Sequence, residues 1–257
     1  MNIDINDAMD YLPHALKNWI KESEKDGTNR ENFVYILDGA VVGFVSVYFL
    51  SNRTTCIKNA IRLNGKLRGQ GLGRQMAVML DSLLVRENAG LKSVISAISD
   101  ANFKEEEIVN PKHGKHLTVA TSHVFCFKHP ELDNFIDMDL DDDSLVTLTK
   151  EDFASKLKDG SFHHLLDENV IHMNWMPVVL DTYEDINFVT RKNQIVKMDR
   201  KVSSLSILTL PFPTAAGPRV ALDIFTKDPG QLKLHLESQL MELRSSKYNN
   251  LLITLFE

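Results

Sequence analysis

The chain has only two cysteines among its 257 residues, Cys56 and Cys126. Both lie in apolar runs typical of strands, so we expect buried thiols in a reducing compartment rather than a disulfide framework. The histidines His163, His164 and His172 have no Cys or carboxylate partner at the spacing of metal ligands, and no metal site is predicted.

Long apolar runs are also missing. No stretch approaches eighteen consecutive apolar residues, so we expect no membrane span. The acidic start M-N-I-D-I-N-D-A-M-D lacks the basic residues and apolar core of a signal peptide, which predicts a cytoplasmic protein. The net charge is −6, and Lys and Arg never run beyond adjacent pairs, which argues against a nucleic-acid partner.

The composition that remains is that of an ordinary globular protein, with 43% apolar and 25% charged residues. Its length fits one large domain or two small ones. The most informative stretch is residues 60–87, A-I-R-L-N-G-K-L-R-G-Q-G-L-G-R-Q-M-A-V-M-L-D-S-L-L-V-R-E. Ile61 and Leu63 alternate with polar neighbours as in a strand, and apolar residues at helical spacing follow the glycines.

Glycines at every second position, 69, 71 and 73, separate this strand from the helix expected over 72–87. A glycine loop lets backbone N–H groups approach a ligand closely, and the helix start adds unpaired N–H groups and a favourable dipole for an anion. The pattern therefore favours a phosphate cradle over a tight turn without a ligand. A P-loop is excluded because no Lys-Ser or Lys-Thr follows, and the spacing differs from the dinucleotide fingerprint.

The segment Arg68-Gly69-Gln70-Gly71-Leu72-Gly73 resembles the pyrophosphate loop of the GNAT superfamily of N-acetyltransferases, R/Q-x-x-G-x-G/A. The resemblance implies acetyl-coenzyme A as co-substrate, with the loop on its pyrophosphate and the preceding strand pairing with its pantetheine. It also implies a contact from Asn102, which otherwise fits a helix cap. The cofactor-binding residues implied are Ile61, Leu63, Arg68, Gly69, Gln70, Gly71, Leu72, Gly73 and Asn102.

The order of expected elements agrees with that fold. A helix over 8–22 precedes a hairpin over 33–50 around Asp38-Gly39, a strand over 54–63, the glycine loop, the helix over 72–87, and a strand over 93–98. A short helix over 101–109 and strands over 117–120 and 123–127 follow. The fold class is therefore mixed α/β, an α+β acetyltransferase fold whose first strand is missing or supplied by another segment.

Two further matches lie outside the glycine loop, one before it and one after it in the chain. The opening Asp10-Tyr11-Leu12-Pro13-His14 and the downstream runs 175–177 and 208–213 resemble the histidine N-acetyltransferase group and a vertebrate relative of it. The resemblance implies an N-terminal acetyltransferase domain over 1–129 and a second, smaller α+β domain over 151–257. The chain stops one residue after the last expected strand, so we expect C-terminal sequence to be missing. Between them, residues 130–150 read as an acidic linker, with seven acids in 131–143.

In the second half, the pattern predicts a short helix over 162–167, strands over 170–176, 204–210, 219–225 and 250–256, and an amphipathic helix over 230–243. Tyr48, on the second strand of the hairpin, fits either an acceptor pocket or the core.

Transfer of acetyl to an amine requires a proton acceptor, a polarised carbonyl and correct positioning. Relatives often carry a glutamate before the glycine loop, and Asn59 stands at that position here, which cannot accept a proton. His116 and His123 are the candidate substitutes because their pKa suits proton transfer, and a structural role is the alternative for each.

Two functions follow as hypotheses. The first is an acetyl-coenzyme-A-dependent N-acetyltransferase that acts on a small amine, an amino acid such as histidine. The second is a non-catalytic acetyltransferase-like protein that binds coenzyme A or a protein partner.

Overall fold

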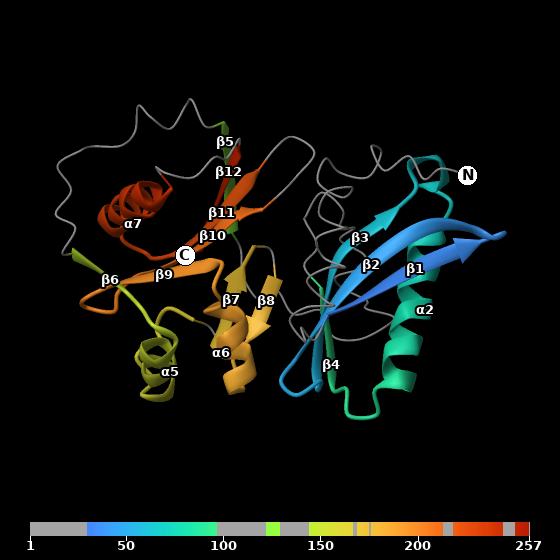
Figure 1. The fold of residues 1–257 in the computed structure, drawn as a ribbon, viewed down its shortest axis with the longest axis horizontal. Coiled ribbons are helices and arrows are strands. Elements are labelled where there is room, and N and C mark those ends of the chain that lie inside the picture. The colour runs from blue at the N-terminus through green and yellow to red at the C-terminus, as the bar shows by residue number, and fades with distance from the viewer. Residues whose placement is uncertain are drawn as a thin grey trace.

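The computed structural model describes residues 30–96, 122–128, 144–166, 169–174, 176–212, 218–243 and 250–256. They form a mixed α+β structure with a four-stranded sheet, a six-stranded sheet and a two-stranded hairpin. Figure 1 shows the four-stranded sheet on the right, the six-stranded sheet on the left, and the hairpin between them. The coarse expectation of an α+β protein with two sheets is confirmed.

The four-stranded sheet has the order β1 (Arg30–Leu37), β2 (Ala40–Leu50), β3 (Thr55–Leu63) and β4 (Ser93–Ser96). β1 and β2 form the expected hairpin, with positive φ at Asp38 and Gly39, as the favoured tight turn requires. β3 and β4 are parallel, and α2 (Leu72–Glu87) connects them with the bounds expected from the sequence. This strand–helix–strand unit carries the glycine loop at the end of β3.

β2 is buried on both faces, which explains its continuous apolar run. Side chains alternate along a strand, so neighbouring residues of β2 contact different partners. One face packs against α2 in a cluster that includes Val45, Val47, Phe49, Met76, Leu80 and Leu84. The other face contributes Tyr48 and Leu50 to a larger cluster shared with the C-terminal half. The two halves of the described chain therefore share a core.

The six-stranded sheet has the order β5-β12-β11-β10-β9-β6. Its members are β5 (Ser122–Lys128), β6 (Leu145–Thr147), β9 (Gln194–Asp199), β10 (Leu205–Phe212), β11 (Arg219–Phe225) and β12 (Asn250–Phe256). β11 and β12 are parallel, joined through α7 (Pro229–Glu242), and the other neighbours are antiparallel. α7 covers one face of the sheet, over a cluster that includes Leu208, Leu222, Ile224, Leu240 and Leu251.

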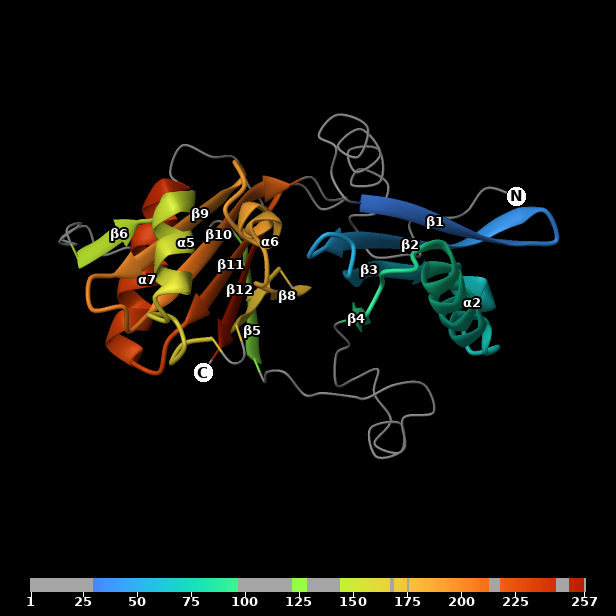
Figure 2. The same cartoon turned by 90° about the horizontal axis from the view of Figure 1, so that it is seen from below.

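The remaining elements lie on the opposite face of that sheet. They are α5 (Lys150–Lys158), α6 (Tyr183–Val189) and the hairpin β7 (Val170–Met173) and β8 (Met176–Val179). Figure 2, which looks from below, also shows β8 between the two sheets, and β8 contacts both β3 and β4. The hairpin thus fills the junction between the two halves.

The structure differs from the sequence expectation in several elements. Residues 162–166 form successive turns rather than the expected helix, with Leu165 and Leu166 N–H groups both bonded to the Phe162 carbonyl. α5, α6 and β9 were not expected. Capping boxes begin α5 at Thr149 and α6 at Thr182, a signal that the sequence does contain.

Two segments also pair differently from the expected domain layout. β5, inside the expected 1–129 domain, is antiparallel to β12 of the C-terminal sheet. β6, inside the expected 130–150 linker, is antiparallel to β9 of the same sheet. Hydrogen bonding between strands distant in the sequence determines both positions, and local composition carries no trace of it.

Candidate active site

The glycine loop joins the end of β3 to the start of α2. Gly69 and Gly71 have φ of +76° and +77°, a conformation that other residues rarely adopt. Gly71 is the N-cap of α2 and provides no side-chain cap, although its carbonyl accepts the N–H groups of Arg74 and Gln75, both at 3.1 Å. A Cβ added at Gly69, Gly71 or Gly73 would meet no atom within 4 Å. The loop is therefore open on the side where its Cβ atoms would stand.

Five consecutive backbone N–H groups in this loop, those of residues 69–73, have no hydrogen-bond partner among the described residues. Three lysine and arginine side chains stand exposed around them: Lys66, Arg68 and Arg74. Unpaired N–H groups at a helix start, together with nearby cations, form a favourable environment for phosphate. The described part of the loop thus has backbone donors and positive charge of the kind that a phosphate group requires.

The strand that leads into the loop has one unpaired edge. β4 pairs with β3 only from Thr55 to Lys58, and no described strand pairs with residues 59–63 on that side. On the other side, Leu63 and Arg62 pair with Gly43 and Phe44 of β2. The stretch contains both Ile61, which is exposed, and Leu63. An extended ligand can therefore hydrogen-bond to this edge as an added strand does.

Asn59 marks the start of that unpaired stretch. Its Nδ2 lies 3.3 Å from the Sδ of Met176, the first residue of β8. Opposite it on β2 stands Ser46, a buried residue whose hydroxyl accepts a hydrogen bond from Arg30 Nε at 2.7 Å. The face of the sheet away from α2 therefore carries polar groups next to Asn59. None of these three polar side chains, those of Asn59, Ser46 and Arg30, is a carboxylate.

A buried carboxylate of the C-terminal sheet contacts the turn that precedes Met176. Asp223, in β11, is fully buried, and its Oδ2 accepts the backbone N–H of Asn174 at 2.7 Å. Asn174 lies in the turn between β7 and β8, two residues before Met176. Burial raises the pKa of Asp223 to about 7, against the lowering effect of the Asn174 N–H and the Thr254 hydroxyl. Sequence reasoning missed this residue, although a lone acid in the apolar run R-V-A-L-D-I-F was a visible signal.

For several other predicted site residues, the structure gives no side-chain position or contact that tests the prediction. Asn102 and His116 lie outside the described residues. His123 lies in β5 and pairs with Leu255 of β12, so its backbone belongs to the C-terminal sheet rather than to the sheet of the glycine loop. The cofactor-binding set from Ile61 to Gly73 is held together on one loop and strand. The catalytic roles of His116 and His123 stay predictions.

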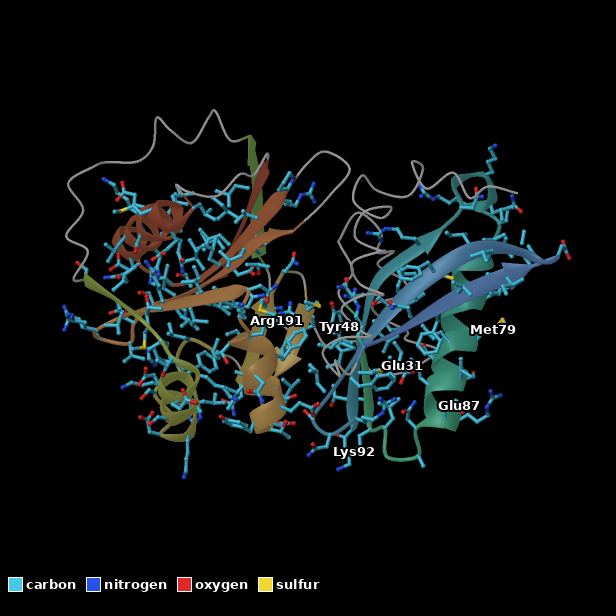
Figure 3. The ribbon with its side chains drawn as sticks, viewed as in Figure 1. Glu31, Tyr48, Met79, Glu87, Lys92 and Arg191 are labelled. Carbon is cyan, nitrogen blue, oxygen red and sulfur yellow. The ribbon has the colours of Figure 1, made fainter. Side chains whose placement is uncertain are left out.

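Tyr48, left open between core and pocket, is buried at the junction of the halves. Its ring makes an edge contact with Phe188 of α6 at 5.2 Å between centroids, and the Arg30 guanidinium lies over it at 4.6 Å. The Arg191 guanidinium lies over Phe188 in turn, at 4.5 Å. Figure 3 shows Tyr48 and Arg191 at the junction between the two halves.

Comparison with known proteins identifies the C-terminal part first. Residues 141–257 match the family described as "Histidine N-acetyltransferase, C-terminal". The match confirms, for this part of the chain, the resemblance to histidine N-acetyltransferases of the GNAT superfamily. No curated protein matches the sequence.

Several solved structures are similar to the chain at low identity. A tandem GNAT protein from the clavulanic acid biosynthesis pathway is 8% identical, with 89% of this chain and 75% of that chain covered and a TM-score of 0.48. A GCN5-related N-acetyltransferase from Kribbella flavida is 12% identical, with 98% and 61% covered and a TM-score of 0.40. An aminoglycoside acetyltransferase from an uncultured soil metagenomic sample is 16% identical, with 34% and 57% covered and a TM-score of 0.28. The chain thus spans less than two thirds of the length of the last two.

No described helix has the length and hydropathy needed to cross a membrane. No three His, Cys, Asp or Glu side chains among the described residues come together as metal ligands do.

Proposed function

We propose that the protein is an acetyl-coenzyme-A-dependent N-acetyltransferase that acts on a small amine, an amino acid such as histidine. The observation that carries the proposal is the row of five N–H groups at the start of α2 that have no partner among the described residues, beside the edge of β3 that no described strand pairs with. The family match over residues 141–257 supports the reaction class and the histidine-like acceptor.

Each part of the co-substrate has a complementary part of this chain. The pyrophosphate fits the N–H groups of residues 69–73, with charge from Lys66, Arg68 and Arg74. The pantetheine amides fit the edge of β3 at Ile61 and Leu63, because amides can pair with an open strand. An N–H group on the same edge can then polarise the thioester carbonyl. Asn102 stays in the proposal as a further contact.

The two halves divide the task in this proposal. The four-stranded unit within residues 1–129 binds the co-substrate, and residues 151–257 cover the acceptor side, where β8 contacts β3 and β4. The pairing of β5 and β6 with β12 and β9 leads us to count both strands with the second unit. Residues 130–150 are then a connection that contributes a strand to that unit.

The alternative is a non-catalytic protein that binds coenzyme A or a partner. Asn59 favours this alternative, because an asparagine amide cannot accept a proton. Its Nδ2 lies next to the Met176 sulfur instead. The two functions share the cradle and differ in turnover. Mass-spectrometric detection of acetylated amino acids, with histidine first, distinguishes them.

The first experiment is thermal unfolding with and without acetyl-coenzyme A. A ligand at a hundred times its dissociation constant raises the free energy of unfolding of the protein by about 2.7 kcal/mol. For a chain of this size we expect the midpoint to rise by about 5–10 °C. A chain without any shift at millimolar co-substrate would contradict both functions that depend on the cradle.

Gly73→Val tests the loop more cleanly than a change at Gly71. Gly71 has a φ of +77°, so a side chain there strains the backbone regardless of the ligand. Gly73 has ordinary φ, and its Cβ position is open, so the valine side chain should occupy the cradle without disturbing the fold. Gly90→Val is the matched control, since Gly90 is equally open and follows the far end of α2. We expect loss of the acetyl-coenzyme A shift in the first variant alone.

A further inference from the structure

Asp223 is an acid in the middle of an apolar strand. In β11 it pairs with Ile207 of β10 and Thr254 of β12, and its neighbours Leu222 and Ile224 pack beneath α7. Because side chains alternate, Asp223 faces the opposite side of the sheet, as does Phe225, which belongs to the core shared with Tyr48. The carboxyl group is therefore directed toward the junction with the N-terminal half, where the Asn174 contact is found.

Half of this carboxyl group has no partner. Oδ2 accepts the Asn174 N–H, but Oδ1 forms no hydrogen bond with any described residue. The Thr254 hydroxyl on the next strand is close enough to lower the pKa of Asp223, yet it too forms no hydrogen bond of normal geometry. Two adjacent buried polar atoms without partners are rare, since each costs about 1–3 kcal/mol. A ligand with N–H groups at this place would satisfy both.

The turn between β7 and β8 links Asp223 to the co-substrate strand. Asn174, with φ of +46°, donates its N–H to Asp223, and Met176 at the other end of the turn contacts Asn59. Asn59 begins the edge of β3 to which we assign the pantetheine. A carboxylate from the C-terminal sheet and the position where relatives carry a glutamate thus contact the same turn, at Asn174 and at Met176 respectively.

We propose that Asp223 is the proton acceptor for the amine in the acetyl transfer, supplied by the C-terminal sheet in place of a glutamate at position 59. The assignment rests on the proposed acetyltransferase function. Oδ1 takes one proton from the acceptor ammonium, and the freed nitrogen lone pair attacks the thioester carbonyl. The C–S bond breaks, the thiolate takes the second proton of that nitrogen, and the proton on Asp223 is released after the products leave, once water can reach the carboxyl group. The balance is one ammonium and one thioester converted to one amide, one thiol and one proton.

The electrostatics of Asp223 suit this role. No charged side chain among the described residues affects its pKa; burial raises it to about 7, and only Asn174 and Thr254 oppose that change. A proton acceptor works best when its pKa is close to the working pH. An ordinary aspartate, with a pKa of 3.8, would be a weaker base by about three pH units.

A purely structural role accounts for less of the geometry. The Asn174 N–H needs one acceptor to hold the turn, and a neutral asparagine carbonyl at position 223 would provide it. Neither the unpartnered Oδ1 nor the adjacent Thr254 hydroxyl is explained by that role. Asp223→Asn is therefore the decisive variant, because it keeps the turn and removes the base.

The experiment compares steady-state acetylation of histidine by the wild-type chain, Asp223→Asn and Asp199→Asn across pH 5.5 to 9. Asp199 is the matched control, a second buried acid of the C-terminal sheet whose oxygens are bonded to Ser204, Ser203 and Lys201. We expect kcat of Asp223→Asn to fall at least about 100-fold, the loss typical of a removed general base, with the acetyl-coenzyme A stabilisation retained. Asp199→Asn should keep the wild-type pH profile.

Two further measurements keep the assignment testable if Asp223→Asn folds poorly. The wild-type kcat/KM should fall on the acid side of about pH 7, and a flat profile there would overturn the proposal. Formate should restore activity to Asp223→Ala in proportion to its concentration and should not affect Asp223→Asn. Unchanged kcat and pH profile in Asp223→Asn refute the proton acceptor alone. Binding of acetyl-coenzyme A by wild type without acetylation of any amine refutes the acetyltransferase function, and the proton acceptor with it.

Discussion

Ser51 donates two hydrogen bonds to Asp185 across 134 positions of the chain, from its backbone N–H at 2.8 Å and from its hydroxyl at 2.9 Å. Ser51 begins the turn between β2 and β3, and Asp185 lies in the first turn of α6, where it also completes the capping box with Thr182. The same helix presents Phe188 to Tyr48. The polar clamp and the aromatic contact therefore hold the four-stranded sheet against the C-terminal half.

Loss of this clamp should destabilise the protein strongly. Asp185 is fully buried and accepts hydrogen bonds from Ser51, Asp181 and Thr182. Hydrogen bonds to a charged group contribute about 1.5–3 kcal/mol, and unpaired buried donors add a penalty. We expect Asp185→Ala to lower the free energy of unfolding by about 3 kcal/mol or more, and Ser51→Ala by about 1 kcal/mol, in urea denaturation. Asp181→Asn, an exposed acid beside it, should change little, and equal effects of the three variants would contradict the clamp.

Two buried groups, His235 and Asp223, should change the free energy of unfolding in opposite directions as the pH rises. Burial lowers the pKa of His235 to about 4 from 6.5, with Asp199 opposing the change, while Ser204 and Ser206 hydroxyls bond both ring nitrogens at 2.8 Å. The unfolded chain binds the proton more readily, so this stabilisation is lost as pH falls from 6.5 to 4. Asp223 has the opposite sign: its pKa rises from 3.8 to about 7, so stability is lost as pH rises through that range.

Each group changes the free energy of unfolding by about 3–4 kcal/mol over its full titration range. Because the two changes have opposite signs, they nearly cancel between pH 4 and 6.5. We expect the wild-type free energy of unfolding to be nearly flat there. Asp223→Asn should make stability rise with pH, and His235→Gln should make it fall with pH, by urea denaturation at half-unit intervals. Parallel curves for wild type and Asp223→Asn would show that this carboxyl group titrates as an ordinary aspartate.

Replacement by alanine should destabilise the protein at Gly43 and stabilise it at Gly73. A Cβ at Gly43 would lie 2.6 Å from Met76 Sδ and 3.2 Å from both the Arg62 carbonyl oxygen and Tyr35 Cβ. The methionine can move, but the other two atoms belong to paired strands, so Gly43→Ala should cost about 1–3 kcal/mol. Gly73→Ala meets no atom within 4 Å and adds a better helix former, so it should stabilise by up to about 1 kcal/mol. Thermal midpoints of the two variants test the pair, and a loss at Gly73 would mean that the loop is not open.

Local signals in the sequence were sufficient to predict the position of the glycine loop and its flanking elements. Asp38-Gly39 between two β-rich runs predicted the hairpin, and the three alternate glycines before an amphipathic run predicted the start of α2 at Leu72. β11 and β12 were also expected with their observed bounds, because each is a short apolar run between turn-forming residues. In these segments the hydrophobic period and the turn residues agree.

The rest of the site depends on contacts between distant segments. Asn59 was known as a departure from relatives, but its contact with Met176, 117 positions away, could not be read from either segment. Asp223 looked like an isolated acid in a strand until its register with Thr254 and its bond to Asn174 were known. Strand pairing also moved β5, and with it His123, to the C-terminal sheet. Such pairings are determined by packing of whole sheets rather than by local pattern.

Cys56 should be inert in the folded protein. Burial raises its pKa from 9.0 to about 11, with Lys58 lowering it by less and Asp81 raising it further. The Cys56 thiol is fully buried, as the sequence predicted, and it has no disulfide partner among the described residues. At pH 8 only about 0.1% would be thiolate, the reactive form, even if reagent could reach it. We expect iodoacetamide at pH 8 to leave the Cys56 peptide unmodified in the native protein and to alkylate it fully in denaturant, as measured by peptide mass. Rapid native labelling at Cys56 would show that β3 opens from α2, because this thiol packs in the cluster between them.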